Sequence, residues 1–252
     1  MVIQANGPVT EVKRLGSEIF SVWISEARIS QKIKPGQFIG VKVSEGTDLL
    51  LRRPFSVADV NGDKIRIVFR VVGPGTERLA RSKKGDKWDI IGPLGKPAPL
   101  VRNRTVVICG GGVGVAPLLY LTRVLHKANQ VVVLLGARCA PELIMVSDFR
   151  RVGVKVQLTT EDGSQGVKGL VTEALAPVLS EMRAPVVYAC GPKGMIKALY
   201  PLSEKVKVWA FLEERMGCGI GVCYGCAVQK KAGGYLRLCK DGPVVSLDEV
   251  VL

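Results

Sequence analysis

Four cysteines in the last fifth of the chain carry its clearest chemical signal. Cys218, Cys223 and Cys226 follow a C-x4-C-x2-C spacing, and Cys239 comes after twelve further residues. Thiolates at this spacing are typical of [2Fe–2S] cluster ligands. Glycines alternate with these cysteines and let backbone N–H groups approach sulfide ions. Four thiolates also suit a structural zinc ion, so a zinc site is the alternative interpretation.

Two glycine motifs predict a nucleotide site. Gly112, Gly114 and Pro117 form a G-x-G-x-x-P turn after an apolar strand, and Cys190-Gly191-Pro192 ends a later strand. Glycines before a helix let a diphosphate reach backbone N–H groups at the positive end of the helix dipole. Ligands of open α/β sheets bind beyond the carboxyl ends of the strands, where both motifs fall. The alternative is two tight turns with a buried cysteine.

Arg53-Pro54-Phe55-Ser56 could bind a flat cofactor that carries phosphate. Its guanidinium can bind phosphate, its ring can stack, and its hydroxyl can bond to a ring nitrogen. The same tetrapeptide could instead be an edge strand with a proline. Gly73-Pro74-Gly75-Thr76 adds a second turn that could take phosphate, and it opens a short helix predicted over 77–81.

The elements that must position these residues fall into three predicted regions. Residues 1–100 read as short strands, including 19–24, 38–43 and 64–72, with a hairpin at Asn61-Gly62, which predicts a small antiparallel β-barrel. Residues 101–205 alternate strands and helices, which predicts a doubly wound α/β domain with a parallel sheet. Its expected strands are 105–109, 131–135, 154–158 and 186–190, and its expected helices are 117–127 and 169–180. From about residue 205 we expect regular structure to thin, leaving 206–252 as a small cysteine-bearing module.

Composition narrows the function classes. The chain has 252 residues, 47% of them hydrophobic, and a formal net charge of +14. Its basic residues are scattered and not interleaved with aromatics, so we expect no nucleic-acid partner. The apolar runs are short or broken by glycine, so we expect no membrane span. Seven cysteines, four of them grouped, favour a reducing cytoplasmic location over a disulfide framework.

In this order, the motifs resemble the ferredoxin–NADP reductase superfamily. The stretch from Glu213 to Cys226, with Leu238-Cys239-Lys240-Asp241-Gly242-Pro243, is similar to the electron-transfer subunits of type B dihydroorotate dehydrogenase, and the resemblance runs nearly the whole length. It implies an FAD-binding barrel, a pyridine-nucleotide domain and a [2Fe–2S] module. It also implies NADH as the nicotinamide, although Arg138, after the second parallel strand, could meet a 2′-phosphate.

The resemblance also implies residue roles. Ser56 would lie at the reactive nitrogen of the flavin, and Cys190 would complete the catalytic pair at the nicotinamide. FAD would be bound by Arg53, Pro54, Phe55, Ser56, Val68, Phe69, Arg70, Gly75 and Thr76. The nicotinamide nucleotide would be bound by Gly112, Gly114, Pro117, Cys190, Gly191 and Pro192, and the cluster by Cys218, Cys223, Cys226 and Cys239. Phe55 stands where much of the superfamily has Tyr, so a phenol hydrogen bond is lost while stacking stays possible.

The implied partner is a separate FMN-containing catalytic subunit that interconverts dihydroorotate and orotate in a heterotetramer of two plus two. We expect no reaction with dihydroorotate by this chain alone. The alternative is the reductase subunit of a ferredoxin:NADP transhydrogenase or a sulfide dehydrogenase. Cys109 and Cys139 are expected to be small core or near-core residues, and His126 a surface or capping residue, which leaves no set for hydrolase chemistry.

Overall fold

The chain forms two compact units in the computed structural model, which describes residues 1–44 and 46–252. The first unit contains Met1–Ala98, Glu213–Ala227 and Leu236–Pro243. The second contains Pro99–Leu212, Val228–Tyr235 and Val244–Leu252. The three-domain boundaries expected from the sequence stay a prediction.

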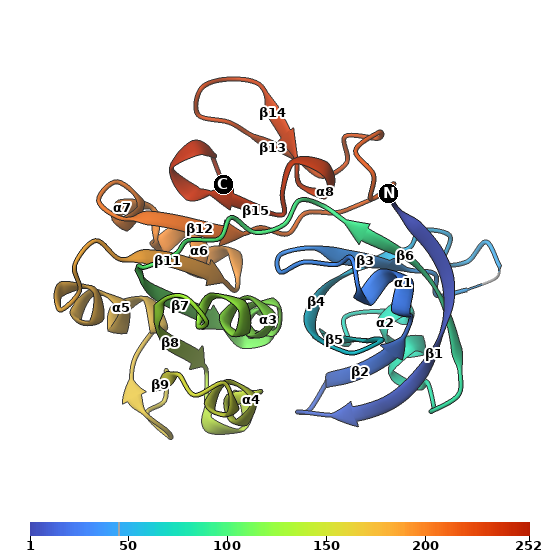
Figure 1. Cartoon of the computed structure of the whole chain (residues 1–252), viewed down its shortest axis with the longest axis horizontal. Helices are drawn as coiled ribbons and strands as arrows, with labels where there is room; N and C mark the ends of the chain where they lie inside the picture. The colour runs from blue at the N-terminus through green and yellow to red at the C-terminus, as the bar shows by residue number, and fades with distance from the viewer. Residues whose placement is uncertain (45) are drawn as a thin grey trace. The chain divides into compact units, whose positions relative to one another are not determined.

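A closed antiparallel barrel forms most of the first unit (Figure 1). Its strand order is β1-β2-β5-β4-β3-β6, and the antiparallel barrel expected for residues 1–100 is confirmed. Buried and more exposed residues alternate along β6, because successive side chains of a strand point to opposite faces. The elements are β1 Ile3–Arg14, β2 Ile19–Ser25, α1 Ala27–Ser30, β3 Phe38–Val41, β4 Arg53–Asn61, β5 Lys64–Arg70, α2 Pro74–Ala80 and β6 Lys87–Leu94.

A seven-stranded sheet in the order β10-β9-β8-β7-β11-β12-β15 organises the second unit. All its pairings are parallel except that of β12 with β15. Helices cover both faces, with α3 and α4 on one side and α5 on the other (Figure 1), so β11 is buried along its whole length. The strands are β7 Thr105–Gly111, β8 Gln130–Ala137, β9 Lys155–Thr160, β10 Val167–Lys168, β11 Val186–Cys190, β12 Lys207–Phe211 and β15 Val244–Ser246.

Short helices complete the connections. A 3-10 turn, η1, covers Gly112–Gly114 and leads into α3, Val115–Leu125. The other elements are η2 Ala140–Glu142, α4 Val146–Arg151, α5 Val171–Ser180, α6 Lys193–Ala198, α7 Tyr200–Ser203, β13 Ala227–Gln229, β14 Tyr235–Arg237, α8 Leu238–Asp241 and η3 Leu247–Glu249. Within the described residues, no helix is both long and apolar enough to cross a bilayer.

The sequence analysis was wrong about where regular structure ends. We expected it to thin from about residue 205, but β12 is a sixth parallel strand of the large sheet and β15 returns antiparallel beside it. The pairing of β15 with β12 joins segments more than thirty residues apart, for which local periodicity holds no signal. The predicted hairpin is confirmed, with Asn61 paired to Lys64 between β4 and β5.

Candidate functional site

The four cysteines belong to two segments of the first unit. Cys218, Cys223 and Cys226 lie on the loop 213–227, and Cys239 lies on α8. Cys226 and Cys239 are buried, Cys218 is half-buried and Cys223 is exposed. One half of the constellation is therefore shielded from water, and the other half reaches the surface.

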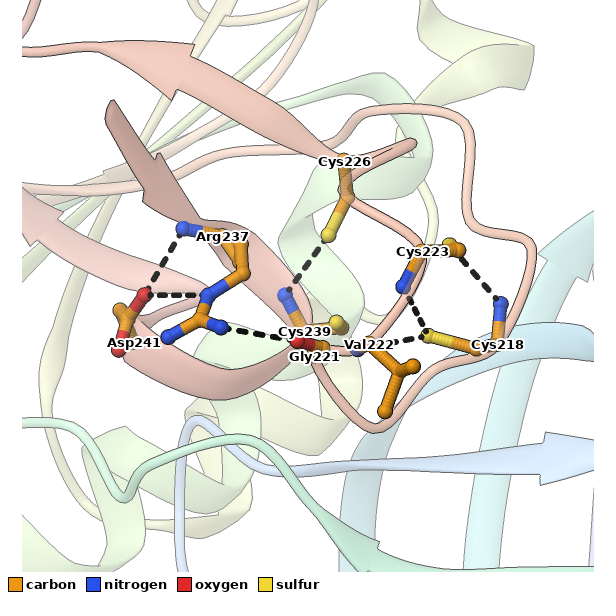
Figure 2. A network of polar contacts seen from close by, with 8 residues as sticks. All are labelled: Cys218, Gly221, Val222, Cys223, Cys226, Arg237, Cys239 and Asp241. Carbon is orange, nitrogen blue, oxygen red and sulfur yellow. Dashed lines mark hydrogen bonds and ion pairs between the residues drawn. The ribbon is translucent and has the colours of Figure 1, made fainter. Parts of the chain in front are cut away.

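The cysteine sulfurs accept backbone N–H groups and come together in two pairs (Figure 2). Cys218 Sγ accepts from Val222 N at 3.3 Å and from Cys223 N at 3.4 Å, while Cys223 Sγ accepts from Cys218 N at 3.4 Å. In the second pair, Cys226 Sγ accepts from Cys239 N at 3.4 Å. N–H donors aimed at sulfur favour the thiolate, which is the form that binds metal.

Cys218 and Cys239 differ in proton affinity. Burial acts to raise the pKa of Cys218, but backbone N–H groups of residues 220, 222 and 223 outweigh it and lower that pKa to about 6. Burial first, and then the neighbouring Cys226 thiol, raise the pKa of Cys239 to about 12. Cysteine binds metal as the thiolate, so a bound metal would displace the protons of these neighbouring thiols.

The two cysteine pairs together supply the four thiolates that a [2Fe–2S] cluster needs. A [2Fe–2S] cluster takes four thiolates over two irons, and pairs at Cys218/Cys223 and Cys226/Cys239 supply two for each. A tetrahedral zinc would need all four sulfurs around one point.

Arg237 joins the two cysteine-bearing segments (Figure 2). Its Nη1 donates to the carbonyl oxygen of Gly221 at 2.9 Å, and its Nε lies 3.3 Å from Asp241 Oδ2 on α8. Its backbone N–H also donates to Asp241 Oδ2 at 2.9 Å, and its guanidinium lies 4.9 Å from the centre of the Tyr224 ring. Gly221 has a φ of 86°, which a residue with a side chain rarely adopts.

The end of β6 supports the cysteine segments within the first unit. Lys96 N donates to the carbonyl oxygen of Gly242 at 2.6 Å. A Cβ at Gly95 would lie 2.9 Å from both that oxygen and Pro243 Cδ, so the backbones touch there. The residues after β6 thus contact the segment that follows α8, the helix that carries Cys239.

The nucleotide motifs of the second unit lie against each other. A Cβ at Gly114 would come within 2.7 Å of Gly191 N and 2.8 Å of the Cys190 carbonyl, so only glycine permits this approach. Gly112 has a φ of 56° and open space beside it. Pro117 lies in the first turn of α3, and Pro192 precedes α6.

These motifs lie where the strand order reverses. β7 pairs with β8 on one side and with β11 on the other, so the glycine turn after β7 and the Cys190-Gly191-Pro192 turn flank the switch point. Dinucleotides bind at this point of doubly wound sheets. The arrangement can therefore hold a diphosphate between two backbone turns and the N-terminus of α3.

In the first unit, Arg53 and the turn before α2 come together. A Cβ at Gly75 would lie 2.7 Å from Arg53 Nε, so the guanidinium lies over the backbone of Gly75. Thr76 Oγ1 accepts from Val72 N at 2.9 Å and from Gly73 N at 3.2 Å, which fixes the turn. A guanidinium beside a helix start is suited to phosphate.

The aromatic residues expected at a flavin form a cluster. The Phe55 and Phe69 rings are buried, with centroids 5.3 Å apart and planes tilted by 48°. Ser56 is half-buried on β4 and pairs with Phe38, whereas Pro54 is exposed. Val68 is buried on β5, and Arg70 at its end is half-buried. The contacts of these residues with a flavin stay predictions.

The remaining candidates behave as structural residues. Cys109 is fully buried in β7, where burial raises its pKa to about 12. Cys139 is half-buried at the start of η2. His126 is exposed and caps the C-terminus of α3. These positions confirm the expectations for Cys109 and His126.

The sequence analysis assigned no role to Arg237, Asp241 or Glu142, although it singled out Arg138. Arg237 and Asp241 flank Cys239 at a spacing of four, and Arg138 and Glu142 show the same spacing after β8. Opposite charges four residues apart form ion pairs on helical turns, and this spacing was the sequence signal for both pairs. It is weak, because such pairs are common on any protein surface.

Two regions of the chain match models of known protein families. Residues 213–251 match the model described as iron-sulfur cluster binding domain of dihydroorotate dehydrogenase B. Residues 107–200 match the model described as oxidoreductase NAD-binding domain. The two matches cover the cysteine segments and the glycine motifs respectively.

Relatives of the chain match over its full length. The chain is 41% identical over 244 residues to "Dihydroorotate dehydrogenase B (NAD(+)), electron transfer subunit" of Caldanaerobacter subterraneus subsp. tengcongensis, covering 95% of each chain. It is 35% identical over 262 residues to the protein of the same name from Bacillus mycoides, covering all of both chains.

Solved structures agree with the fold. A chain of the NADH-dependent reduced ferredoxin-NADP oxidoreductase superposes with a TM-score of 0.88 at 32% identity, covering 98% of this chain and 90% of that one. A ferredoxin NADP+ reductase from Neisseria gonorrhoeae superposes at 0.67 with 18% identity, covering 81% and 92%. The second likeness concerns the barrel and α/β fold alone.

Proposed function

The chain belongs to the family of dihydroorotate dehydrogenase B electron transfer subunits, and from this membership we propose that it carries electrons between NAD(H) and a separate catalytic subunit in pyrimidine biosynthesis. The observation that carries the proposal is the four-cysteine constellation in two pairs, within a region that matches the iron–sulfur domain of that enzyme. The match to the NAD-binding domain over residues 107–200 supports NAD(H) as the other end of this electron-transfer route.

Each cofactor is assigned to residues whose geometry fits it. Arg53, lying over the backbone of Gly75, would hold the pyrophosphate of FAD, and Ser56 on β4 would hydrogen-bond its ring system. The backbone turns at Gly112–Gly114 and Cys190–Gly191 would hold the diphosphate of NAD(H). The four cysteine thiolates would ligate a [2Fe–2S] cluster.

The cofactors supply the redox chemistry, since a bound flavin takes up hydride from reduced nicotinamide and an iron–sulfur cluster passes single electrons. The contribution of this chain is to bind and orient them. Gly114 and Gly191 keep the nucleotide turns in contact, and the N–H donors around Cys218 and Cys226 stabilise anionic sulfur. The buried pair, Cys226 and Cys239, excludes water from one side.

The family name implies a catalytic partner subunit. We propose that this partner contains FMN, that two copies of each subunit form a heterotetramer, and that the assembly is cytoplasmic. The exposed side of the cysteine loop supports a docking role, because Cys223 lies between Val222, 72% exposed, and Tyr224, 58% exposed. Apolar side chains that remain exposed beside a redox centre favour contact with a protein.

Co-expression of the chain with its catalytic partner tests the proposal. The expected result is a complex that contains flavin and iron and reduces orotate with NADH, whereas the chain alone oxidises NADH and leaves orotate unchanged. A purified chain that shows no flavin absorbance and no response to NADH would overturn the proposal.

A ferredoxin:NADP transhydrogenase subunit is the second candidate. The superposition on the NADH-dependent reduced ferredoxin-NADP oxidoreductase favours it. The identity of 41% with the dihydroorotate dehydrogenase relative against 32% with that chain makes it the weaker of the two. An FMN-bearing barrel dehydrogenase as the partner supports the first function, and a large glutamate-synthase-like subunit supports the second.

A further inference from the structure

Arg138, at the end of β8, is the cation that could bind the 2′-phosphate of NADPH, but a carboxylate holds it. Its Nε lies 3.0 Å from Glu142 Oε2, and its Nη2 contacts Glu142 Oε1. This is a two-point pairing, in which the planar guanidinium matches the planar carboxylate. The Glu142 side chain is only 26% exposed, so the ion pair is anchored at its acidic end.

The loops after β8 and β9 are tied together around this pair. Asp162 N donates to the Arg138 carbonyl oxygen at 3.2 Å, and Ala140 N donates to Ser164 Oγ at 2.8 Å. Ser164 Oγ in turn donates to Asp162 Oδ1 at 2.6 Å. These contacts use the backbone and Ser164, so the loop stays in place when the Arg138 or Glu142 side chain is changed.

Further negative charge surrounds Arg138. The hydrogen bonds and charge of Glu142 raise the pKa of the Arg138 guanidinium, and the charges of Cys139 and Glu161 add to the effect. Glu142, Glu161 and Asp162 thus gather at the carboxyl ends of β8 and β9, although the chain carries a net charge of +14. A local acidic edge on a basic protein opposes the overall attraction for phosphate.

The place of this acidic edge in the sheet gives it a role. In doubly wound domains, the glycine turn is followed by a helix and then by a second strand, and this second strand ends beside the adenosine ribose of the nucleotide. There an acidic residue accepts a hydrogen bond from the 2′-OH of NADH, or an arginine accommodates the 2′-phosphate of NADPH. Here β8 is that strand. We propose that Glu142 is a specificity residue that occupies the Arg138 guanidinium, so that the site takes NADH and rejects the 2′-phosphate of NADPH.

The inference rests on the proposed function, since it concerns the nicotinamide nucleotide of the same site. Its test compares kcat/KM for NADPH and NADH in the holoenzyme with its partner. Glu142→Gln removes the competing carboxylate and frees Arg138, so the NADPH/NADH ratio should rise about tenfold or more, as expected for a new hydrogen bond to a charged group. The double variant Glu142→Gln/Arg138→Gln should lose that rise.

Glu181→Gln is the matched control, because it removes the same charge at the C-cap of α5, in the connection that leads to the start of β11. It should leave the ratio as in the wild type. A second readout is competition of adenosine 2′-monophosphate with NAD+ in a binding titration, and this inhibitor should bind Glu142→Gln about tenfold more tightly.

The outcomes separate the inference from the function. A wild-type protein that uses NADH and a Glu142→Gln variant with an unchanged ratio would overturn the inference alone. A wild-type protein that prefers NADPH would also overturn it. A wild-type protein that binds neither nucleotide would overturn the proposed function instead.

Discussion

Arg237 donates from Nη1 to the carbonyl oxygen of Gly221 over 2.9 Å. Arg237 directly precedes α8, which carries Cys239, and Gly221 lies on the loop that carries the other three cysteines. With the Asp241 ion pair and the contact to the Tyr224 ring, this bond makes one side chain responsible for the relative placement of the two thiolate pairs. Outer residues that orient metal ligands affect metal retention as well as reactivity.

Replacement of Arg237 should therefore loosen the cluster. Arg237→Gln removes the guanidinium that bonds to Gly221 and Asp241, and we expect the cluster to be lost to a chelator roughly tenfold faster. Arg237→Lys keeps the charge but cannot form the planar fork of a guanidinium, so its rate of cluster loss should lie between those of the wild type and Arg237→Gln. The measurement is the decay of iron–sulfur absorbance in EDTA.

The control for this experiment is Arg183→Gln, which removes an exposed arginine of the second unit. It should leave the decay rate as in the wild type. If Arg237→Gln also retains its cluster like the wild type, the positioning role of Arg237 is wrong.

Gly114→Ala should damage the nucleotide site. A Cβ there would lie within 2.8 Å of the Cys190 carbonyl, so the turn after β7 must move away from the turn after β11. We expect a destabilisation of about 1–3 kcal/mol, typical of overpacking, and a loss of NAD+ affinity of at least about tenfold. Calorimetric titration with NAD+ measures the second effect.

Gly194→Ala is the matched control. It adds the same methyl group on α6, where no described atom beyond the neighbouring residues of its own helix lies within 4 Å of the new Cβ. NAD+ affinity should remain, and stability should hold or rise because alanine favours a helix over glycine. Equal loss of affinity in both variants would contradict the close contact at Gly114.

The barrel offers a test by pH. Glu26 accepts from Arg28 Nε at 2.9 Å and from Arg28 N at 3.1 Å at the start of α1, and these bonds lower the pKa of Glu26 from its usual 4.5. A lowered pKa means that the carboxylate stabilises the fold above pH 4.5, and that this stabilisation is lost as the pH falls below it.

Glu26→Gln should therefore lower the unfolding midpoint at pH 7 by roughly 1–2 °C, given a partly solvated pair. The difference from the wild type should shrink at pH 3.5. Glu11→Gln, which changes an exposed residue of β1, is the control and should keep the unfolding midpoint of the wild type. If the unfolding midpoints of Glu26→Gln and the wild type differ equally at both pH values, the ionised Glu26 carboxylate does not stabilise the start of α1.

Much of the fold was predictable because its information is local. The hairpin at Asn61-Gly62 and the buried strand over 186–190 show their period and turn residues in a few consecutive positions. The cysteine spacing and the two glycine motifs are likewise short. The helix expected over 117–127 begins two residues earlier, at Val115, because helix ends carry the weakest signal.

The rest depends on contacts between distant residues. Nothing in the strand pattern of Val244–Ser246 says that it will pair antiparallel with β12. The hydrogen bond from Arg237 to Gly221 joins residues sixteen positions apart, and the hydrogen bond from Lys96 to Gly242 joins residues much farther apart in the sequence. Such pairings are chosen by the whole fold, so residue types alone identify the chemistry but not the residues that position it.

We propose above all that this chain conducts electrons from NADH to a cluster held by Cys218, Cys223, Cys226 and Cys239. The most direct test is an anaerobic titration of the purified, flavin-loaded chain with NADH, with iron and sulfide analysis and electron paramagnetic resonance. We predict about two irons and two sulfides per chain and a paramagnetic iron signal that grows with NADH and is absent from Cys223→Ala. One zinc per chain, or flavin bleaching with no iron signal, would contradict the claim.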